Sequence, residues 1–480
     1  MGWLRGLGLL VAVTCVVWVA VLWHWQGTHR DMSVEDILIY LGALPLTLFA
    51  LLLAARWAWQ GVEKRLTAPE PAANPAETPA AAPTLARPPK AMRVLGAYVT
   101  TPAGDTVGAM LDAAEKNDAC ADLSDTLYDA EGLPVMVSCV PELSTDALTQ
   151  ELEALNTDKS EHPEPSAALL RALSLLEAPL QQAAEALGAW HEAQAPVSQA
   201  APRLHVRVLA AWPQFWNAAE LQVAQTWLQS RLHKWGSNVG LPPSLWLMQP
   251  SAAALPLWSQ VERLADALRH ERLGDALLVL ATHSDVCEQR IQALDDVGQL
   301  FNARRPKGLI PGEAACAMVL DEALLSQPAA GAEDTPWLYA AALQQRDKSV
   351  DAPGRIGAKW STAVLEQAML SRTEAPSASC VVNDADHHSP RGAEMFAAMH
   401  EKFPDLDAAQ DQRMLGPLLG HVGAVAPLLV LASAAELARQ STKPCMALSV
   451  SDPLWRLAAL AEPSPQAVTA STPSESPNAA

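Results

Sequence analysis

Short apolar runs alternate along this chain with longer segments in which apolar residues recur every three or four positions. The short runs predict strands, and the longer amphipathic segments predict helices. Strands are expected at residues 92–99, 133–140, 204–210, 244–248, 276–281, 315–320, 337–343, 379–383 and 445–450. Helices are expected at residues 104–116, 144–155, 166–190, 218–233, 257–270, 361–370, 391–400 and 418–437. This alternation predicts an α/β fold with mostly parallel sheets that helices cover on both faces.

The first 60 residues follow another pattern, with two long apolar segments at residues 7–25 and 37–59. Each is close to the ~20 residues that a helix needs to cross a bilayer. A cleaved signal peptide is the alternative for the first segment. However, no small-residue cleavage site precedes the polar residues 24–36, and a second apolar segment follows at once. The pattern therefore predicts a two-helix transmembrane hairpin over residues 1–60.

Basic residues set the expected orientation of this hairpin. The loop between the two apolar segments holds Arg30 together with acidic residues, whereas a group of basic residues follows the second segment. By the positive-inside rule, both termini and the main body then face the cytoplasm. The basic residues after the second segment are Arg56, Lys64, Arg65, Arg87, Lys90 and Arg93.

Proline and alanine dominate residues 61–91, which predicts an extended linker. Residues 462–480 have a similar composition and are expected to form a disordered tail. The chain has 480 residues, half of them hydrophobic, so the part between can bury more than one core. We expect two related lobes, at residues 92–270 and 271–461.

Charge and cysteine content narrow the class of protein. The formal net charge is −20 and the sequence pI is about 5.0, which makes nucleic acid a poor partner because phosphate binding needs a cationic surface. The seven cysteines include no CxxC pair, so we expect reduced thiols in a cytosolic compartment. No motif indicates a cofactor.

Tryptophans are concentrated in one segment of the chain. Burial in the core is the simpler interpretation, because large rings dominate buried area. The alternative is a partner surface, because tryptophan is enriched among interface hot spots. The candidates for that surface are Trp212, Trp216, Trp227 and Trp235.

Two stretches resemble the ketosynthases of the thiolase-like superfamily. The first is GLIPGEAACAMVL at residues 308–320 with its leading FNARRPK, and the second is VLGAYVTTPAGDTVGAML at residues 94–111. The resemblance implies a thiolase-like fold, in which two related lobes are built from alternating helix and sheet layers.

The same resemblance identifies positions for a nucleophilic cysteine, two histidines and a lysine. The cysteine position falls near Leu257, and no cysteine occurs between Cys139 and Cys287. The loop NDADHHSPRG (383–392) places Ala385 at the first histidine position, and QRMLGPLLGHVGA (412–424) places Pro417 at the second and Gln412 at the lysine. The resemblance therefore implies a degenerate site with no catalytic residues.

Two other histidines near these positions are candidate replacements. His387 could replace the first catalytic histidine only if its loop is reshaped, and His421 is expected one turn further along a helix, facing elsewhere. Asp384, Asp386, His387 and His388 also carry potential metal ligands. Adjacent side chains of an extended strand point to opposite faces, so no metal site is expected there.

The order of the whole chain resembles the type VI lipase adapter protein family: an N-terminal anchor, a Pro/Ala spacer and a degenerate thiolase-like body. This resemblance implies a non-catalytic adapter at the bacterial inner membrane. Its implied partners are a phospholipase effector in the cytoplasm and the spike protein of the type VI secretion system.

Two other classes of function stay open. One is a residual enzyme of the ketosynthase type that binds acyl-thioesters or an acyl-carrier protein through His387 or Cys316. The other is a structural membrane component in which the hairpin oligomerises. Self-association as a homodimer is also open.

Overall fold

A computed structural model describes residues 90–155, 165–194, 204–251, 256–322, 334–354, 357–372 and 378–464. All of them belong to one compact unit. The predicted hairpin, almost all of the linker and residues 465–480 of the predicted tail lie outside the described residues. Within the described ranges, every helix is too short or too polar to cross a membrane.

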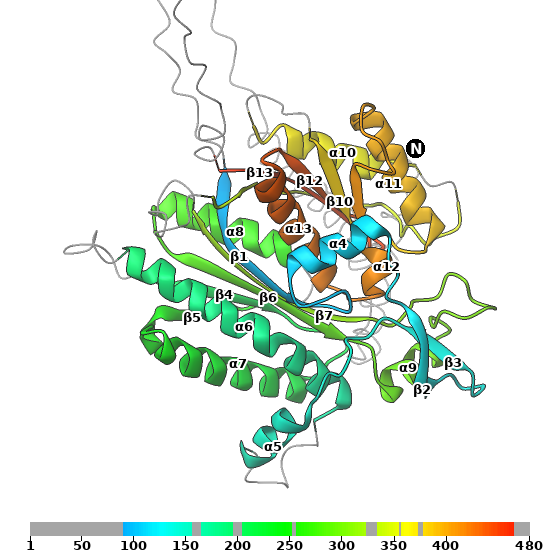
Figure 1. Cartoon of the computed structure of the whole chain (residues 1–480), viewed down its shortest axis with the longest axis horizontal. Coiled ribbons are helices and arrows are strands. Elements are labelled where there is room, and N and C mark those ends of the chain that lie inside the picture. The colour runs from blue at the N-terminus through cyan, green and yellow to red at the C-terminus, as the bar shows by residue number, and fades with distance from the viewer. Residues whose placement is uncertain are drawn as a thin grey trace, which may run out of the picture. The chain divides into compact units, whose positions relative to one another are not determined.

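One mixed sheet of eleven strands runs through this unit (Figure 1). Its order is β11-β10-β12-β13-β8-β1-β7-β6-β4-β5, and β9 pairs with β13. The strands are β1 (Ala91–Thr100), β4 (Val206–Ala211), β5 (Trp246–Met248), β6 (Ala276–Ser284), β7 (Glu313–Glu322), β8 (Trp337–Tyr339), β9 (Ala342–Gln345), β10 (Cys380–Asn383), β11 (Gln412–Met414), β12 (Cys445–Ser449) and β13 (Trp455–Glu462). A separate two-stranded sheet pairs β2 (Asp122–Tyr128) with β3 (Pro134–Val137).

The large sheet consists of two halves with the same topology. In β5-β4-β6-β7-β1 and in β11-β10-β12-β13-β8, the strands follow the order third, second, fourth, fifth, first along the chain. The pairings also match, because the first three strands of each series run parallel and the next two are antiparallel to their neighbours. The halves meet where β1 pairs with β8. The two halves of the sheet are therefore related by a repeat of the same topology.

Two details of the predicted architecture need correction. The halves divide between Glu322 and Trp337, so the predicted boundary at residue 270 falls inside the first half. The sheets are mixed rather than mostly parallel. Every residue of β6 and β7 is buried, which gives the continuous apolar runs typical of parallel strands. These two strands are nevertheless antiparallel to each other, because strand direction depends on the connections and not on burial.

Helices form three layers around the two halves of the sheet (Figure 1). On the outer side of the first half, α6 lies against β1, β6 and β7, and α7 packs on α6. On the outer side of the second half, α10 lies against β13 and packs on α11. In the middle, α13 contacts strands of both halves and also α4. The helices are α4 (Val107–Lys116), α5 (Asp146–Leu155), α6 (Ala167–Gln194), α7 (Ala218–Asn238), α8 (Leu257–Glu271), α9 (Glu288–Asp296), α10 (Lys359–Met369), α11 (Ser389–Lys402), α12 (Gly416–Leu419) and α13 (Val425–Ser441).

Three apolar clusters correspond to these layers. The central cluster combines residues of α4, α8 and α13 with inward-facing residues of both halves of the sheet. Two outer clusters lie under α6 and α7 and under α10 and α11. The result is five alternating layers, with helices outside, a half-sheet on each side and helices in the middle, which agrees with the predicted layering.

The tryptophan segment belongs mainly to the core. Trp216, Trp227 and Trp235 are buried in the cluster under α6 and α7. Trp212 is partly exposed and stacks on Trp216, with ring centroids 5.7 Å apart. The packing interpretation therefore holds for the three buried rings, which cannot present a surface to a partner.

Several elements differ from the sequence prediction. The pattern did not predict β2, α9, β11 or β13, and the expected helix over residues 418–437 is divided into α12 and α13. β13 was missed because its sequence, WRLAALAE, has the alanine and leucine content of a helix. Glu462, predicted as the start of the tail, is the last residue of β13, and its carboxylate accepts a hydrogen bond from Tyr339.

Candidate functional site

The positions that the ketosynthase resemblance assigns to catalytic groups lie around the central helix layer. Leu257 is the first residue of α8, and Gln412 is the first residue of β11. Ala385 follows β10, and Pro417 is the second residue of α12. Leu257 belongs to the central apolar cluster and is 9% exposed.

The two positions assigned to histidines lie next to each other. A Cβ added at Gly416 would lie 2.2 Å from the carbonyl oxygen of Ala385, so the backbones of the two loops are in direct contact. Leu415 N donates to Asn383 O at 2.8 Å, which holds the loops in this register. The fold therefore brings together the positions that the sequence indicated, and they carry Ala385 and Pro417.

The loop after β10 does not continue as an extended strand. His387 and His388 were expected on opposite faces of an extended strand. Their rings instead lie together, with centroids 4.5 Å apart, because the chain turns into α11 at this point. His387 Nε2 lies 2.9 Å from Gly308 O, and His388 Nε2 lies 2.5 Å from Lys307 O. Both rings thus fasten this loop to the start of the GLIPGEAACAMVL stretch.

Ionic contacts strengthen this attachment, which we call the clamp and which consists of Asp386, His387, His388 and Arg391. His388 Nδ1 lies 2.9 Å from Asp386 Oδ2, and Arg391 Nη1 donates to the same oxygen at 2.6 Å. Burial alone would raise the pKa of the Asp386 carboxyl, but His388 and Arg391 outweigh it and lower the pKa to about 2. Burial would lower the pKa of His388, but its hydrogen bond to Asp386 and the charge of that carboxylate raise it. Both ring nitrogens of His388 lie at hydrogen-bonding distance from oxygen acceptors, Asp386 Oδ2 and Lys307 O.

These shifts predict how stability changes with pH. The pKa of Asp386 is lower in the folded chain than its value near ~4 in the unfolded chain. Its ionised carboxylate therefore stabilises the fold above pH ~4, and this contribution is lost as the pH falls toward about 2. The pKa of His388 is higher in the folded chain than its value near ~6.5 in the unfolded chain. The protonated ring therefore stabilises the fold below pH ~6.5, and this contribution is lost as the pH rises through the folded pKa. The clamp should therefore stabilise most between about pH 4 and 6.5.

Urea unfolding of the wild type and of Asp386→Asn across this range tests the prediction. The difference between the two midpoints should be largest inside the window and shrink on both sides. Asp405→Asn, at an exposed position, is the matched control. A wild-type advantage over Asp386→Asn that does not vary with pH would contradict the expectation.

The GLIPGEAACAMVL stretch contacts several segments that are distant along the chain. Glu313 is fully buried at the start of β7 and accepts hydrogen bonds from the Arg171 guanidinium, Ser284 Oγ and Val140 N. A Cβ added at Gly312 would lie 2.0 Å from Leu419 O. The close approach of α12 therefore requires a glycine at this position.

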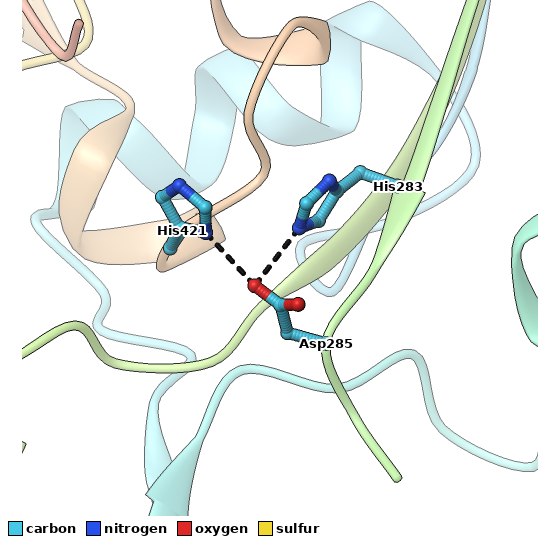
Figure 2. A group of neighbouring side chains, drawn as sticks. All are labelled: His283, Asp285 and His421. Atoms are coloured by element: carbon cyan, nitrogen blue, oxygen red, sulfur yellow. Dashed lines mark hydrogen bonds and ion pairs between the residues drawn. The ribbon is translucent and has the colours of Figure 1, made fainter. Parts of the chain in front are cut away.

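A second cluster of side chains lies beside this contact. His283 is near the end of β6, Asp285 follows that strand, and His421 lies between α12 and α13. Figure 2 shows both rings directed at one carboxylate oxygen of Asp285. His283 Nε2 and His421 Nδ1 lie 2.9 and 2.8 Å from Asp285 Oδ2. Arg290 Nε donates to Asp285 Oδ1 at 2.8 Å.

His421 is not in a helix, contrary to the prediction. Gly420 and Gly423 both have positive φ angles, +62° and +50°, which break the helix on either side of it. His421 N donates to Ile310 O at 2.8 Å, so the segment runs beside the GLIPGEAACAMVL stretch. The break turns the ring toward Asp285. Sequence analysis also missed His283 and Asp285, although His-Ser-Asp at the end of a predicted buried strand was the available signal.

Burial and the neighbouring groups have opposite effects on the pKa values of Asp285 and His283. Although burial alone would raise the pKa of the Asp285 carboxyl, the charges and hydrogen bonds of His283 and His421 hold it well below its usual range. Burial lowers the pKa of His283, against the opposing effect of Asp285. The Asp285 carboxyl is therefore ionised near neutral pH.

A pocket of about 400 Å³ lies at the start of α6. Its lining includes Cys139, Cys287, Arg171 and hydroxyl groups of the β2–β3 region. Burial raises the pKa of both thiols. Cys316, the other candidate nucleophile, is fully buried in β7, and burial raises its pKa as well. The three sulfurs are therefore held as thiols, which are poor nucleophiles.

No protein-family model and no curated protein match this sequence. Solved structures with a similar fold include a type II polyketide synthase acyl-carrier protein in complex with its ketosynthase, AntDE:AntF. That match has 11% identity and a TM-score of 0.52, over 78% of this chain and 99% of that chain. The ketosynthase from module 6 of the bacillaene synthase of Bacillus subtilis 168 matches at 12% identity and a TM-score of 0.51, over 78% and 72%. The chain therefore has the thiolase-like α/β fold of the ketosynthases.

Proposed function

We propose that this chain is a non-condensing binding protein built on the ketosynthase fold. The proposal rests on the residues that occupy the positions assigned to the nucleophile and the two histidines. They hold Leu257, Ala385 and Pro417, none of which can transfer a proton or attack a thioester. Removing the nucleophile alone from a cooperative catalytic set costs about a million-fold in rate, or roughly 8 kcal/mol of barrier.

The surroundings of these positions support the same proposal. Leu257 packs in one apolar cluster with Leu415 and Leu418, and Ala385 is fully buried against Gly416. His387, the nearest candidate replacement, has Nε2 at hydrogen-bonding distance from Gly308 O. The side chains of Leu257 and Ala385 offer no charged or hydrogen-bonding group that could stabilise a polar intermediate.

The partner we propose is a phospholipase effector, which this chain would bind in the cytoplasm and deliver to the type VI secretion spike. The support is the resemblance of the whole chain to the type VI lipase adapters, together with a body whose assigned catalytic positions are inert. In this proposal the hairpin of residues 1–60 holds the adapter at the inner membrane.

Co-purification of the full-length chain with each lipase encoded beside it tests this proposal. We expect one of them to be retained as a stable complex and an unrelated lipase to be lost on washing. If every neighbouring lipase is lost under the same conditions, the adapter proposal fails.

Exposed apolar side chains indicate where to change the surface first. Leu123, Tyr128 and Leu133, in and beside the β2–β3 hairpin, are each more than half exposed. Leu133→Asp should weaken a complex that uses this hairpin. Leu370→Asp is the matched control, because Leu370 is exposed on a different element, the end of α10.

A second candidate function is recognition of an acyl-thioester or an acyl-carrier protein. The similar fold of a ketosynthase solved with its acyl-carrier protein favours it. Incubating the full-length chain with acyl-thioesters distinguishes the candidates. Turnover would overturn the non-condensing proposal, and saturable binding without turnover would favour this second candidate.

A further inference from the structure

We propose that His283, Asp285 and His421 bind one first-row divalent cation, with Zn²⁺ the best match to the donor set. Two imidazole nitrogens and one carboxylate oxygen are a ligand combination that such cations prefer. This site is separate from the positions of Leu257, Ala385 and Pro417. If no cation binds here, the proposed function is unaffected.

The donor atoms already converge on a volume of the right size. His283 Nε2, His421 Nδ1 and a carboxylate oxygen of Asp285 all lie within 4.8 Å of one another. The two rings are nearly perpendicular, at 87°, with centroids 5.1 Å apart, so they approach the carboxylate from different directions (Figure 2). Tetrahedral zinc with bonds of about 2.1 Å holds its ligand atoms about 3.4 Å apart. The two nitrogens lie 2.9 and 2.8 Å from Asp285 Oδ2, so each must move only about 0.5–0.6 Å farther from this oxygen.

Backbone contacts fix the three ligands in place. His283 and Asp285 are two residues apart at the end of β6, which places their side chains on the same face. Asp285 N donates to Gly312 O at 3.0 Å, and His421 N donates to Ile310 O at 2.8 Å. The GLIPGEAACAMVL stretch thus holds both ligand segments, and a preorganised site loses little entropy when it binds.

A second layer of contacts orients the carboxylate. Arg290 Nε donates to Asp285 Oδ1, which leaves Oδ2 facing the two imidazoles. The Arg290 guanidinium in turn lies 3.6 Å from the centre of the Phe215 ring. The same ring packs edge-on against His283 at 5.7 Å. Contacts of this kind fix the orientation of metal ligands, and removing one typically costs 10–100-fold in affinity.

The site is buried except on the side of His421, which is open to solvent. Asp285 and the His283 ring are buried, whereas the His421 side chain is 35% exposed. A cation can enter past His421, and water can complete its coordination there. Three protein ligands with one open position are typical of zinc sites that exchange a ligand.

The other histidine cluster serves as a contrast. Asp386, His387 and His388 also lie close together. However, both ring nitrogens of His388 face acceptors, and Arg391 donates to Asp386 Oδ2. The rings of His387 and His388 are thus already engaged with the carbonyl oxygens of Gly308 and Lys307, and this cluster works as a clamp between two loops. The ring nitrogens of the proposed site face a carboxylate oxygen that a cation can share.

Metal analysis of the purified full-length chain tests the proposal. We expect about one Zn²⁺ per chain after incubation and dialysis, and a visible absorption band of tetrahedral Co²⁺ when Co²⁺ replaces it. Zn²⁺ should also raise the thermal unfolding midpoint, because it binds the folded state. A wild-type chain that retains no ion and gives no Co²⁺ band would overturn the proposal without reference to any variant.

Substitutions locate the ion. His421→Ala and Asp285→Asn should abolish the Co²⁺ band and the rise in the unfolding midpoint, and Arg290→Ala should weaken binding 10–100-fold. His270→Ala, at an exposed position on α8, is the matched control and should behave as the wild type. Circular dichroism verifies that each variant is folded. Wild-type affinity in a folded His421→Ala variant would place the ion elsewhere and refute the assignment.

Discussion

Gly312→Ala should destabilise the protein by about 3 kcal/mol or more, one of the two largest effects that we expect from a single substitution. The added Cβ would lie 2.0 Å from Leu419 O and 3.1 Å from two further backbone atoms of the α12–α13 connection. No side chain can rotate to relieve such a contact, so two backbone segments must separate. The bridges from Gly312 to Ser138 and from Pro311 to His421 would be disturbed with them.

Urea unfolding of the full-length chain measures this effect. Gly392→Ala is the matched control, because a Cβ added at Gly392, inside α11, meets nothing within 4 Å. There the exchange of glycine for alanine in a helix should stabilise the protein by up to about 1 kcal/mol. A Gly312→Ala variant within about 1 kcal/mol of the wild type would show that the loops are not packed as described.

Glu394→Ala is the second substitution with a large expected effect, a loss of about 3–5 kcal/mol. Glu394 is buried on α11 and accepts hydrogen bonds from two arginines and from Ser361. Arg456 on β13 is completely buried, and the Arg346 side chain is 9% exposed. Without the carboxylate, two guanidinium groups lose their buried counter-charge in a medium of low dielectric constant.

Glu401→Ala tests whether burial is the cause. Glu401 lies on the same helix, but its side chain is 58% exposed. We expect a change within about 0.5 kcal/mol there. Equal effects of the two substitutions in urea unfolding would rule out the buried network as a major contribution to stability.

The proposed function and the proposed cation site rest on different residues. The positions assigned to the nucleophile and the two histidines hold apolar side chains, whereas the break between α12 and α13 presents His421 to Asp285 and His283. An adapter can use such a cation site to rigidify the contact between its halves. The metal measurement and the co-purification are independent, so either proposal can fail alone.

The amino-acid sequence by itself determined most helices and strands, because each buries one periodic apolar stripe or one short apolar run. The resemblance of its motifs also assigned Leu257, Ala385, Gln412 and Pro417 to the positions of catalytic groups, since motif spacing along the chain carries that information. Only the tertiary structure decided the strand directions, the boundary between the halves and the burial of Trp216, Trp227 and Trp235. It alone brought His421 to His283 and Asp285, 136 residues away from Asp285 along the chain. Contacts at such separation depend on how backbones pack, and local periodicity does not encode that.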